Sequence, residues 1–141
     1  MTSLASSIPS AADYANEPVR FPQLQAVDLL AEAHASTGVY RNTVINQINQ
    51  HCLRLSTFEG EYPWHFHPHS DELFLILEGH LYIDFADHPT IRLESGQILT
   101  VPAGVVHRTR ADTRVVNACF EELAAATEFV PPPADWIDPR R

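Results

Sequence analysis

Histidines dominate one short stretch of the chain, HFHPHSDE at residues 65–72. Alternate side chains of an extended strand share a face, so the imidazoles of His65 and His67 can converge. Pro68 cannot donate to a strand ladder and ends regular pairing. The turn that follows allows Glu72, which opens the next strand, to return to the same pair of histidines. Imidazoles together with a carboxylate suit a divalent transition metal.

A fourth candidate ligand, His107, lies in VPAGVVHRTR, where the turn residues Pro102 and Gly104 direct a new strand. Four polar side chains inside a barrel would be costly to bury without an ion to bind them. The alternative is a set of scattered surface histidines, since the chain contains 8 of them. Taken alone, the HFH pattern does not decide between these interpretations.

A β-rich pattern runs from about residue 39 to the end of RVVNACFEEL. Short apolar runs are separated by turn signals about every 8 to 12 residues, which is typical of an antiparallel sandwich or barrel. No long helical pattern interrupts them, so a parallel α/β sheet is not expected. The run ELFLILEG is apolar on both faces, which indicates a strand with the barrel interior on one side and another sheet or subunit on the other.

The chain divides into four predicted segments. A helix is expected within 23–35, where Leu24, Val27 and Leu30 recur at helical spacing. The N-terminal residues are rich in Ser, Ala and Pro, which is typical of a loosely ordered segment. The segments are a flexible 1–22, a helical brace at 23–38, a β-barrel at 39–125 and a Pro-rich tail at 126–141.

Composition narrows the classes of partner. The 141 residues fit one domain, and the net charge of −9 leaves no basic patch for nucleic acid or an anionic membrane.

Cys52 and Cys119 form no C-x-x-C motif and are expected to be buried and reduced. The N-terminus has no secretory signal pattern, and no apolar run reaches the roughly 18 residues of a membrane helix, so a cytoplasmic location is expected.

Two ordered motifs carry a family resemblance. Residues 60–79 resemble the first cupin motif, G-x5-H-x-H-x3-4-E-x6-G, with one residue fewer than usual after the first glycine. Residues 96–111 resemble the second, G-x5-P-x-G-x2-H-x3-N, with Ala111 where the family commonly has an asparagine that is not a metal ligand. The matching residues are Gly60, His65, His67, Glu72 and Gly79 in the first motif and Gly96, Pro102, Gly104 and His107 in the second.

The resemblance, which extends from about residue 42 to 122, is to small single-domain microbial cupins. It implies an all-β fold, an antiparallel β-barrel of the jelly-roll or double-stranded β-helix type, with a short helix before it. It also implies one divalent transition metal ion per chain, which could be Fe, Mn, Ni, Co, Cu or Zn, with water completing the shell. The implied ligands are His65, His67, Glu72 and His107.

Strand alternation places further side chains. Phe74 and Ile76 follow Glu72 at steps of two, and Thr109 follows His107, so all three are expected to line the cavity beside the metal. His69 could support a ligand, but a turn histidine facing solvent is favoured.

Two charged residues are expected on the surface. Arg54 could anchor a carboxylate substrate if it faced inward, but an outward, solvated orientation is favoured. Tyr82 and Asp84 alternate with apolar neighbours and are expected to face out.

We expect a metal-dependent enzyme, dioxygenase-like by analogy with the family, that acts on a small organic substrate. Glu72 is the candidate catalytic residue, because few other groups in the site could serve as a base. A metal-dependent isomerase or lyase would use the same ligands, and a metal- or ligand-binding sensor would use them without turnover. A homodimer is expected, because the leucine-rich outer faces would otherwise expose apolar area.

Overall fold

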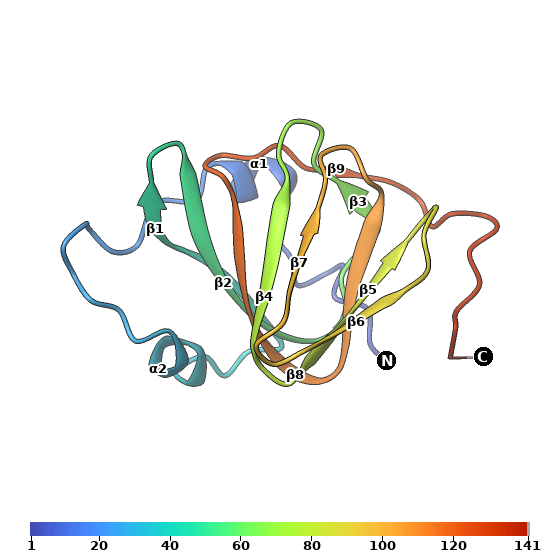
Figure 1. The fold of residues 1–141 in the computed structure, drawn as a ribbon, viewed down its shortest axis with the longest axis horizontal. Coiled ribbons are helices and arrows are strands. Elements are labelled where there is room, and N and C mark those ends of the chain that lie inside the picture. The colour runs from blue at the N-terminus through green and yellow to red at the C-terminus, as the bar shows by residue number, and fades with distance from the viewer. Residues whose placement is uncertain (141) are drawn as a thin grey trace.

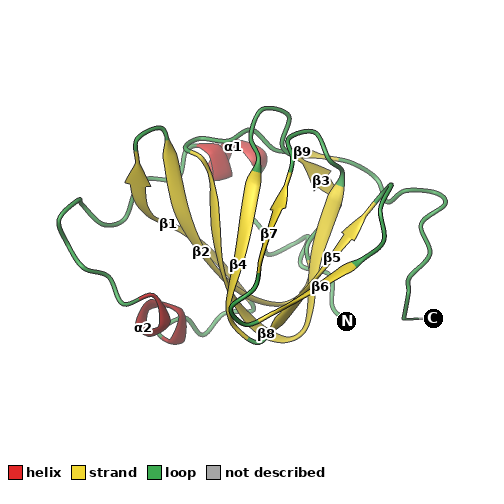
Figure 2. Ribbon diagram, viewed as in Figure 1, coloured by secondary structure: helices red, strands yellow, loops and turns green. Residues whose placement is uncertain are grey.

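The computed structural model describes residues 1–140 and shows a curled antiparallel β-sheet with two short helices (Figures 1 and 2). This confirms the expected all-β cupin-type fold with a short N-terminal helix. The helices are α1 (Ala11–Ala15) and α2 (Leu29–His34). The strands are β1 (Tyr40–Ile48), β2 (His51–Glu61), β3 (His65–Phe66), β4 (Glu72–Glu78), β5 (His80–Phe85), β6 (Ile91–Glu94), β7 (Ile98–Val101), β8 (His107–Glu122) and β9 (Glu128–Phe129).

Strand β8 is the longest, with 16 residues, and connects most of the sheet. One of its sides pairs with β2 and, at His107, with His65 of β3. Its other side pairs with β5 near its start and with β4 near its end. The sheet therefore curls around β8, and the two histidine motifs, far apart in sequence, meet as register partners.

The interior of the curled sheet holds the main apolar core. Along β4, the buried side chains Phe74 and Ile76 alternate with the partly exposed Leu73, Leu75 and Leu77, as expected for a strand with one face inward. The buried members of this core are Leu4, Phe58, Phe74, Ile76, Leu81, Ile83, Phe85, Leu93, Val101, Ala111, Val115 and Cys119.

A second apolar cluster lies on the outer face of the sheet, beneath α2. It joins Ala33 of the helix to strand residues such as Leu55 and Val116. The helix is shorter than the predicted brace, because it begins only after Asp28, whose side chain accepts from the backbone N–H of Ala31. Leu24 has a left-handed backbone (φ 63°) and is fully exposed, so residues 23–28 do not form a helix despite their helical spacing.

The N-terminal segment is ordered against the barrel, which differs from the flexible segment predicted at 1–22. Leu4 is buried in the core, and the backbones of Thr2 and Leu4 bond to that of Glu61. Gly60 permits this approach: a Cβ there would lie 2.5 Å from the carbonyl oxygen of Thr2. The Ser- and Ala-rich composition concealed two anchors, Leu4 and Tyr14.

The sheet also extends past the predicted barrel boundary at residue 125. Strand β9 pairs with β3, so the start of the predicted tail belongs to the barrel. Further along the tail, the ring of Trp136 packs against that of Trp64, with ring centroids 5.4 Å apart, and the guanidinium of Arg108 lies over both rings. No helix within residues 1–140 is long and apolar enough to cross a membrane.

Two surface predictions are wrong. Arg54 is only 1% exposed, because it lies on the same inward face of β2 as Ser56 and Phe58, where carboxylates neutralise it. Asp84 is fully buried, because the guanidinium groups of Arg108 and Arg110 close over it. Alternation identified which residues share a face, but not that long side chains would cover that face.

The buried Asp84 cluster predicts a large effect on stability. We expect Asp84→Asn to lower the free energy of unfolding at pH 7 by about 3–5 kcal/mol, because the fully buried guanidinium of Arg110 loses its counter-charge. Burial raises the pKa of Asp84, but Arg110, Thr90 and Arg108 outweigh it and hold the pKa below 3.8. The stabilisation is therefore fully present above pH 3.8 and is lost as the pH falls through the lower folded-state value.

Urea unfolding across pH measures this, with Asp87→Asn in an exposed turn as the matched control. Equal midpoints for the two variants at pH 7 would contradict the assignment.

Candidate metal centre

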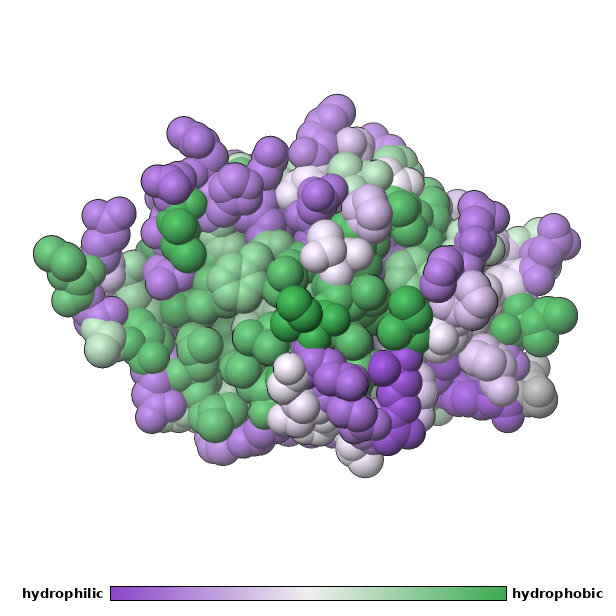
Figure 3. Space-filling model, viewed as in Figure 1, coloured by the Kyte–Doolittle hydropathy of each residue, from purple (hydrophilic) through white to green (hydrophobic). Residues whose placement is uncertain are grey.

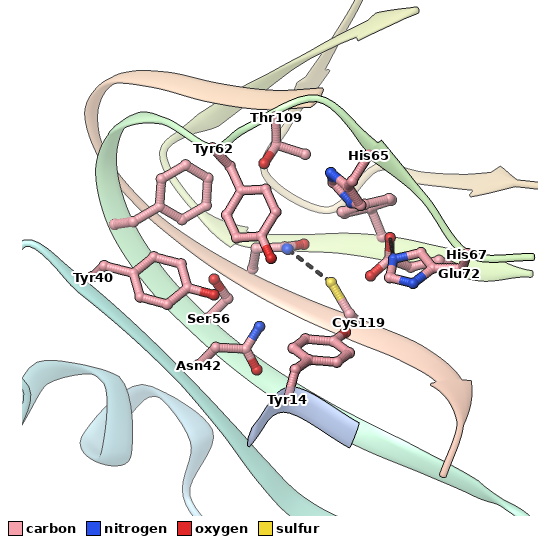
Figure 4. Close-up of a pocket in the computed structure, with 13 residues that line it drawn as sticks. Tyr14, Tyr40, Asn42, Ser56, Tyr62, His65, His67, Glu72, Thr109 and Cys119 are labelled. Atoms are coloured by element: carbon pink, nitrogen blue, oxygen red, sulfur yellow. Dashed lines mark hydrogen bonds and ion pairs between the residues drawn. The ribbon is translucent and has the colours of Figure 1, made fainter. Parts of the chain in front are cut away.

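The four predicted ligands lie together inside the barrel. One nitrogen or oxygen atom from each of His65, His67, Glu72 and His107 lies within 4.8 Å of the others, and all four residues are buried. The register pair of His65 with His107 joins the two motifs, and Glu72 begins β4 beside them. Figure 4 shows His65, His67 and Glu72 at one end of a shared pocket.

Each imidazole is oriented by a backbone carbonyl. A carbonyl oxygen can only accept, so the Nδ1 atom facing it carries a proton and Nε2 is the atom that can bind a metal ion. This arrangement fixes the ring and the tautomer that metal-binding histidines need. The distances from Nδ1 to oxygen are 2.7 Å for His65 and Pro63, 3.0 Å for His67 and Ala126, and 2.8 Å for His107 and Val105.

The atoms that face the centre of the cluster are poorly satisfied by the protein alone. Oε1 of Glu72 lies 3.5 Å from Nε2 of both His67 and His107. Neither Glu72 Oε1 nor His107 Nε2 has a hydrogen-bond partner, although both are buried. Buried polar atoms are rarely left without a partner. A divalent cation would satisfy them, so the three imidazoles and one carboxylate fit a transition metal ion.

The electrostatics of the cluster prepare it for a cation. Burial raises the pKa of Glu72, but His107 and His67 outweigh it and hold the pKa well below its ordinary value, so the carboxylate is charged. Burial, with His107 and His67 nearby, lowers the pKa of His65, which keeps it neutral. Burial also lowers the pKa of His67, but the Glu72 carboxylate raises it to about 9. A metal ion would therefore replace a proton on His67.

The wall of the pocket beside the cluster carries several polar, uncharged groups. It is lined by side chains that include Tyr14, Tyr40, Asn42, Ser56, Tyr62 and Asn117 (Figure 4). The hydroxyl of Tyr40 and the amide oxygen of Asn117 are buried there without hydrogen-bond partners. Such a wall can hydrogen-bond the oxygen or nitrogen atoms of a ligand that also reaches the cluster.

The other predicted site residues divide into three outcomes. Phe74 and Thr109 line the pocket as expected. Ile76 does not: it faces inward but lies further along β4, in the apolar core. His69 is exposed in the turn after Pro68, which agrees with the favoured orientation.

Several residues that line the pocket or support it were not predicted from the sequence. Ser56 could have been placed by alternation along β2 from Phe58. Tyr14 comes from the segment predicted to be flexible and the carbonyl of Ala126 from the predicted Pro-rich tail, and only the folded chain brings them to His67.

Comparison with known proteins agrees with this geometry. The family model described as "Cupin_2: Cupin domain" matches residues 55–120, which include all four candidate ligands. The uncharacterized protein YdbB of Bacillus subtilis (strain 168) is 48% identical over 103 residues, 73% of this chain and 91% of that protein. This chain belongs to the cupin family.

Solved structures show the same cupin fold. A cupin-2 domain protein from Shewanella frigidimarina NCIMB 400 is 29% identical, with a TM-score of 0.64 over 68% of this chain and 93% of that one. Protein NMB1881 from Neisseria meningitidis is 26% identical, with a TM-score of 0.63 over 70% of this chain and 99% of that one. This small cupin therefore has the family's barrel and a buried cluster that could hold a metal ion.

The ligand assignment predicts the metal content of variants. We expect His107→Ala to raise the dissociation constant of the metal by at least about 10–100-fold. That range is the effect of losing a residue that only supports a metal ligand. The exposed His69→Ala is the matched control and should bind metal as the wild type does. Titration of metal-stripped protein with Co²⁺ and elemental analysis after dialysis measure both. Equal affinity of the two variants would contradict the ligand set.

Proposed function

We propose that this cupin is a metal-dependent enzyme, of the oxygenase type, that acts on a small organic substrate. The observation that supports this most directly is the buried cluster of three oriented imidazoles and one carboxylate, set at the end of a pocket. The residues at this site, rather than the fold, carry the proposal, because the same fold supports many functions. The acidic chain, with net charge −9, favours a small molecule over nucleic acid as the partner.

The residues of the cluster would have different roles in such a reaction. His65, His67 and His107 would hold the ion through Nε2, and Glu72 would hold it through an oxygen. When bound, a divalent transition metal supplies Lewis-acid and redox chemistry to an oxygen-containing substrate. Glu72 is charged in the cluster and is our candidate for accepting a proton from the substrate.

The pocket wall would orient the substrate. Asn42 is held by Arg54, whose Nη1 donates to its Oδ1 at 3.1 Å, so the Asn42 amide nitrogen remains available to donate. The hydroxyls of Tyr40 and Ser56 lie on the same wall (Figure 4). A substrate with one oxygen toward the cluster and another toward this wall would be held at both ends.

Binding without turnover is the second candidate. The cavity itself has a volume of about 30 Å³, which is enough for roughly two water molecules. A site this confined suits a sensor or storage role unless the pocket opens. An isomerase or lyase reaction would use the same ligand set and is distinguished by its products.

Oxygen consumption tests the proposal. We expect metal-loaded protein to consume O₂ with one or more members of a panel of enolic and catechol-like compounds, and metal-stripped protein to be at least about 100-fold slower. An oxygen electrode and mass spectrometry of the products measure this, with His69→Ala as a fully active control. Stoichiometric metal binding without turnover of any compound would contradict the enzyme proposal and favour the binding protein.

We also propose that the molecule is a homodimer. Figure 3 shows a broad hydrophobic area on the outer face of the sheet. It includes Leu75 and Leu77 of β4 and Phe120 of β8, and Ile98 of β7 is 60% exposed beside Leu75. Apolar area of this kind on an antiparallel sheet is typical of an interface between subunits.

Light scattering during size-exclusion chromatography tests the dimer. We expect twice the chain mass of 15.8 kDa for the wild type. We expect Leu75→Arg to give monomers, because it places a charge on the apolar face. Ile137→Arg, at a residue that is 80% exposed in the C-terminal segment, is the control and should stay dimeric. A monomeric wild type would contradict this proposal.

A further inference from the structure

The metal pocket is too small for an organic molecule of ordinary size. Its cavity of about 30 Å³ is far smaller than the roughly 300–1,000 Å³ of a typical ligand site. A substrate can reach the cluster only if part of the wall moves. The question is which part of the wall the structure holds least firmly.

One wall comes from the N-terminal segment, outside the region 55–120 that matches the cupin family. Tyr14 of α1 is 5% exposed and lines the pocket, and its ring is stacked on that of His67 with centroids 6.0 Å apart. Figure 1 shows α1 at the same end of the barrel as β3 and β9, where the histidines lie. Tyr14 thus stands between the candidate metal ligands and the outside of the barrel.

The segment that carries Tyr14 is attached to the sheet at its two ends. Residues 5–19, between the attachments, form no strand pairing with the barrel. A segment that is attached at both ends can move away from the barrel in its middle while its ends stay bound. The attachments are the backbone bonds of Thr2 and Leu4 with Glu61 at one end, and those of Arg20 with Val44 and of Phe21 with Ile45 at the other.

Ile8 packs against the apolar core near the start of this segment, whereas around Tyr14 the segment is held by polar contacts to Arg54. The guanidinium lies 3.6 Å from the centre of the Tyr14 ring, and Nη2 donates to the Tyr14 carbonyl at 2.7 Å. Nη1 pairs with the Glu17 carboxylate at 3.0 Å, and the Tyr14 hydroxyl donates to Glu121. Glu121 in turn lies 2.8 Å from Arg54 Nε.

Contacts of this kind are easier to open than an apolar core. Water can replace hydrogen bonds and ion pairs when a segment lifts, so the net loss is modest. Glu17 already reaches solvent, since its side chain is 25% exposed. Arg54 would keep Glu121 as its counter-charge in the open state, so opening would not leave a buried cation unpaired.

We propose that residues 5–19 form a gate over the metal pocket, in which Tyr14 limits the size of the entering ligand and the Arg54–Glu17 pair holds the gate closed. The identity of that ligand as a substrate rests on the proposed function. The motion of the gate does not require a bound metal, so the two proposals can fail separately.

Cys119 provides a reporter of opening. It lines the pocket and is 3% exposed. Cys52 is fully buried on β2 and does not line the pocket, but it lies on the same face as Arg54, so Cys119 is the cysteine that reports on the pocket. Alkylation of Cys119 by iodoacetamide, followed by peptide mass spectrometry and compared with global unfolding measured by urea denaturation, therefore separates gate opening from global unfolding.

The variants have distinct expected results. We expect Tyr14→Ala to raise the alkylation rate of Cys119 at least about tenfold, because the side chain that fills the entrance is gone. We expect Glu17→Gln to raise it about two- to fivefold, which is the effect of losing one partly exposed ion pair. Glu94→Gln removes an exposed ion pair with Arg92 elsewhere on the surface and should change nothing.

Ligand size is tested with a second reagent of the same reactive group. A fluorescein-bearing iodoacetamide should label wild-type Cys119 far more slowly than iodoacetamide does, and Tyr14→Ala should remove most of that difference. Unchanged size selection in Tyr14→Ala would overturn the role given to Tyr14.

Two outcomes overturn the gate itself. One is that wild-type Cys119 is alkylated no faster than the measured rate of global unfolding allows, which would mean that only global unfolding exposes the pocket. The other is that Glu17→Gln leaves the Cys119 rate unchanged at an unchanged melting temperature. Failure of the protein to bind metal would overturn the proposed function and would leave these measurements of the gate intact.

Discussion

The pairing of strand β8 with four neighbours is the constraint on which the rest of the structure depends. Its 16 residues follow β2 along one side and pass from β5 to β4 along the other, so the sheet must curl. The inward side chains of this one strand include His107, Thr109, Asn117, Cys119 and Glu121. Strand β8 thus contributes side chains to the candidate metal cluster, to the pocket wall and to the neutralisation of Arg54.

The same strand helps to explain how a small barrel tolerates so many buried polar groups. At the cluster, backbone carbonyls satisfy the outer nitrogen of every imidazole and leave the inner atoms for a cation. Beyond the pocket, Arg54 is neutralised by Glu121 and Glu17. On the outer face, Asp84 neutralises Arg110 and Arg108. The buried guanidinium groups of Arg54 and Arg110 thus each have a carboxylate partner, as the cost of burial requires.

Sequence patterns predicted the parts of the site that lie on regular strands or inside the motifs. The spacing of His65, His67 and Glu72 was enough to predict that these three side chains lie together, and the second motif added His107. Period-two alternation was correct about the inward direction of both Phe74 and Ile76. It could not tell that only Phe74 reaches the pocket, because alternation gives a face and not a depth along the barrel.

The misplaced residues share a physical cause. Arg54 was expected on the surface because exposed charges are the common case, and Asp84 because it alternates with apolar neighbours. Their burial depends on partners from other segments: Glu121 and Glu17 for Arg54, and Arg110 for Asp84. Period-two alternation carries no information about such partners.

The sequence by itself determined the strand pattern, the cupin motifs and the four residues that could hold a metal, because these are expressed in short-range spacing. Only the tertiary structure decided what closes the pocket. Tyr14 bonds to Glu121 across 107 positions and to Arg54 across 40, and composition marked its segment as flexible. Contacts between distant segments form only when the barrel curls, so the fold alone makes the N-terminus part of the site.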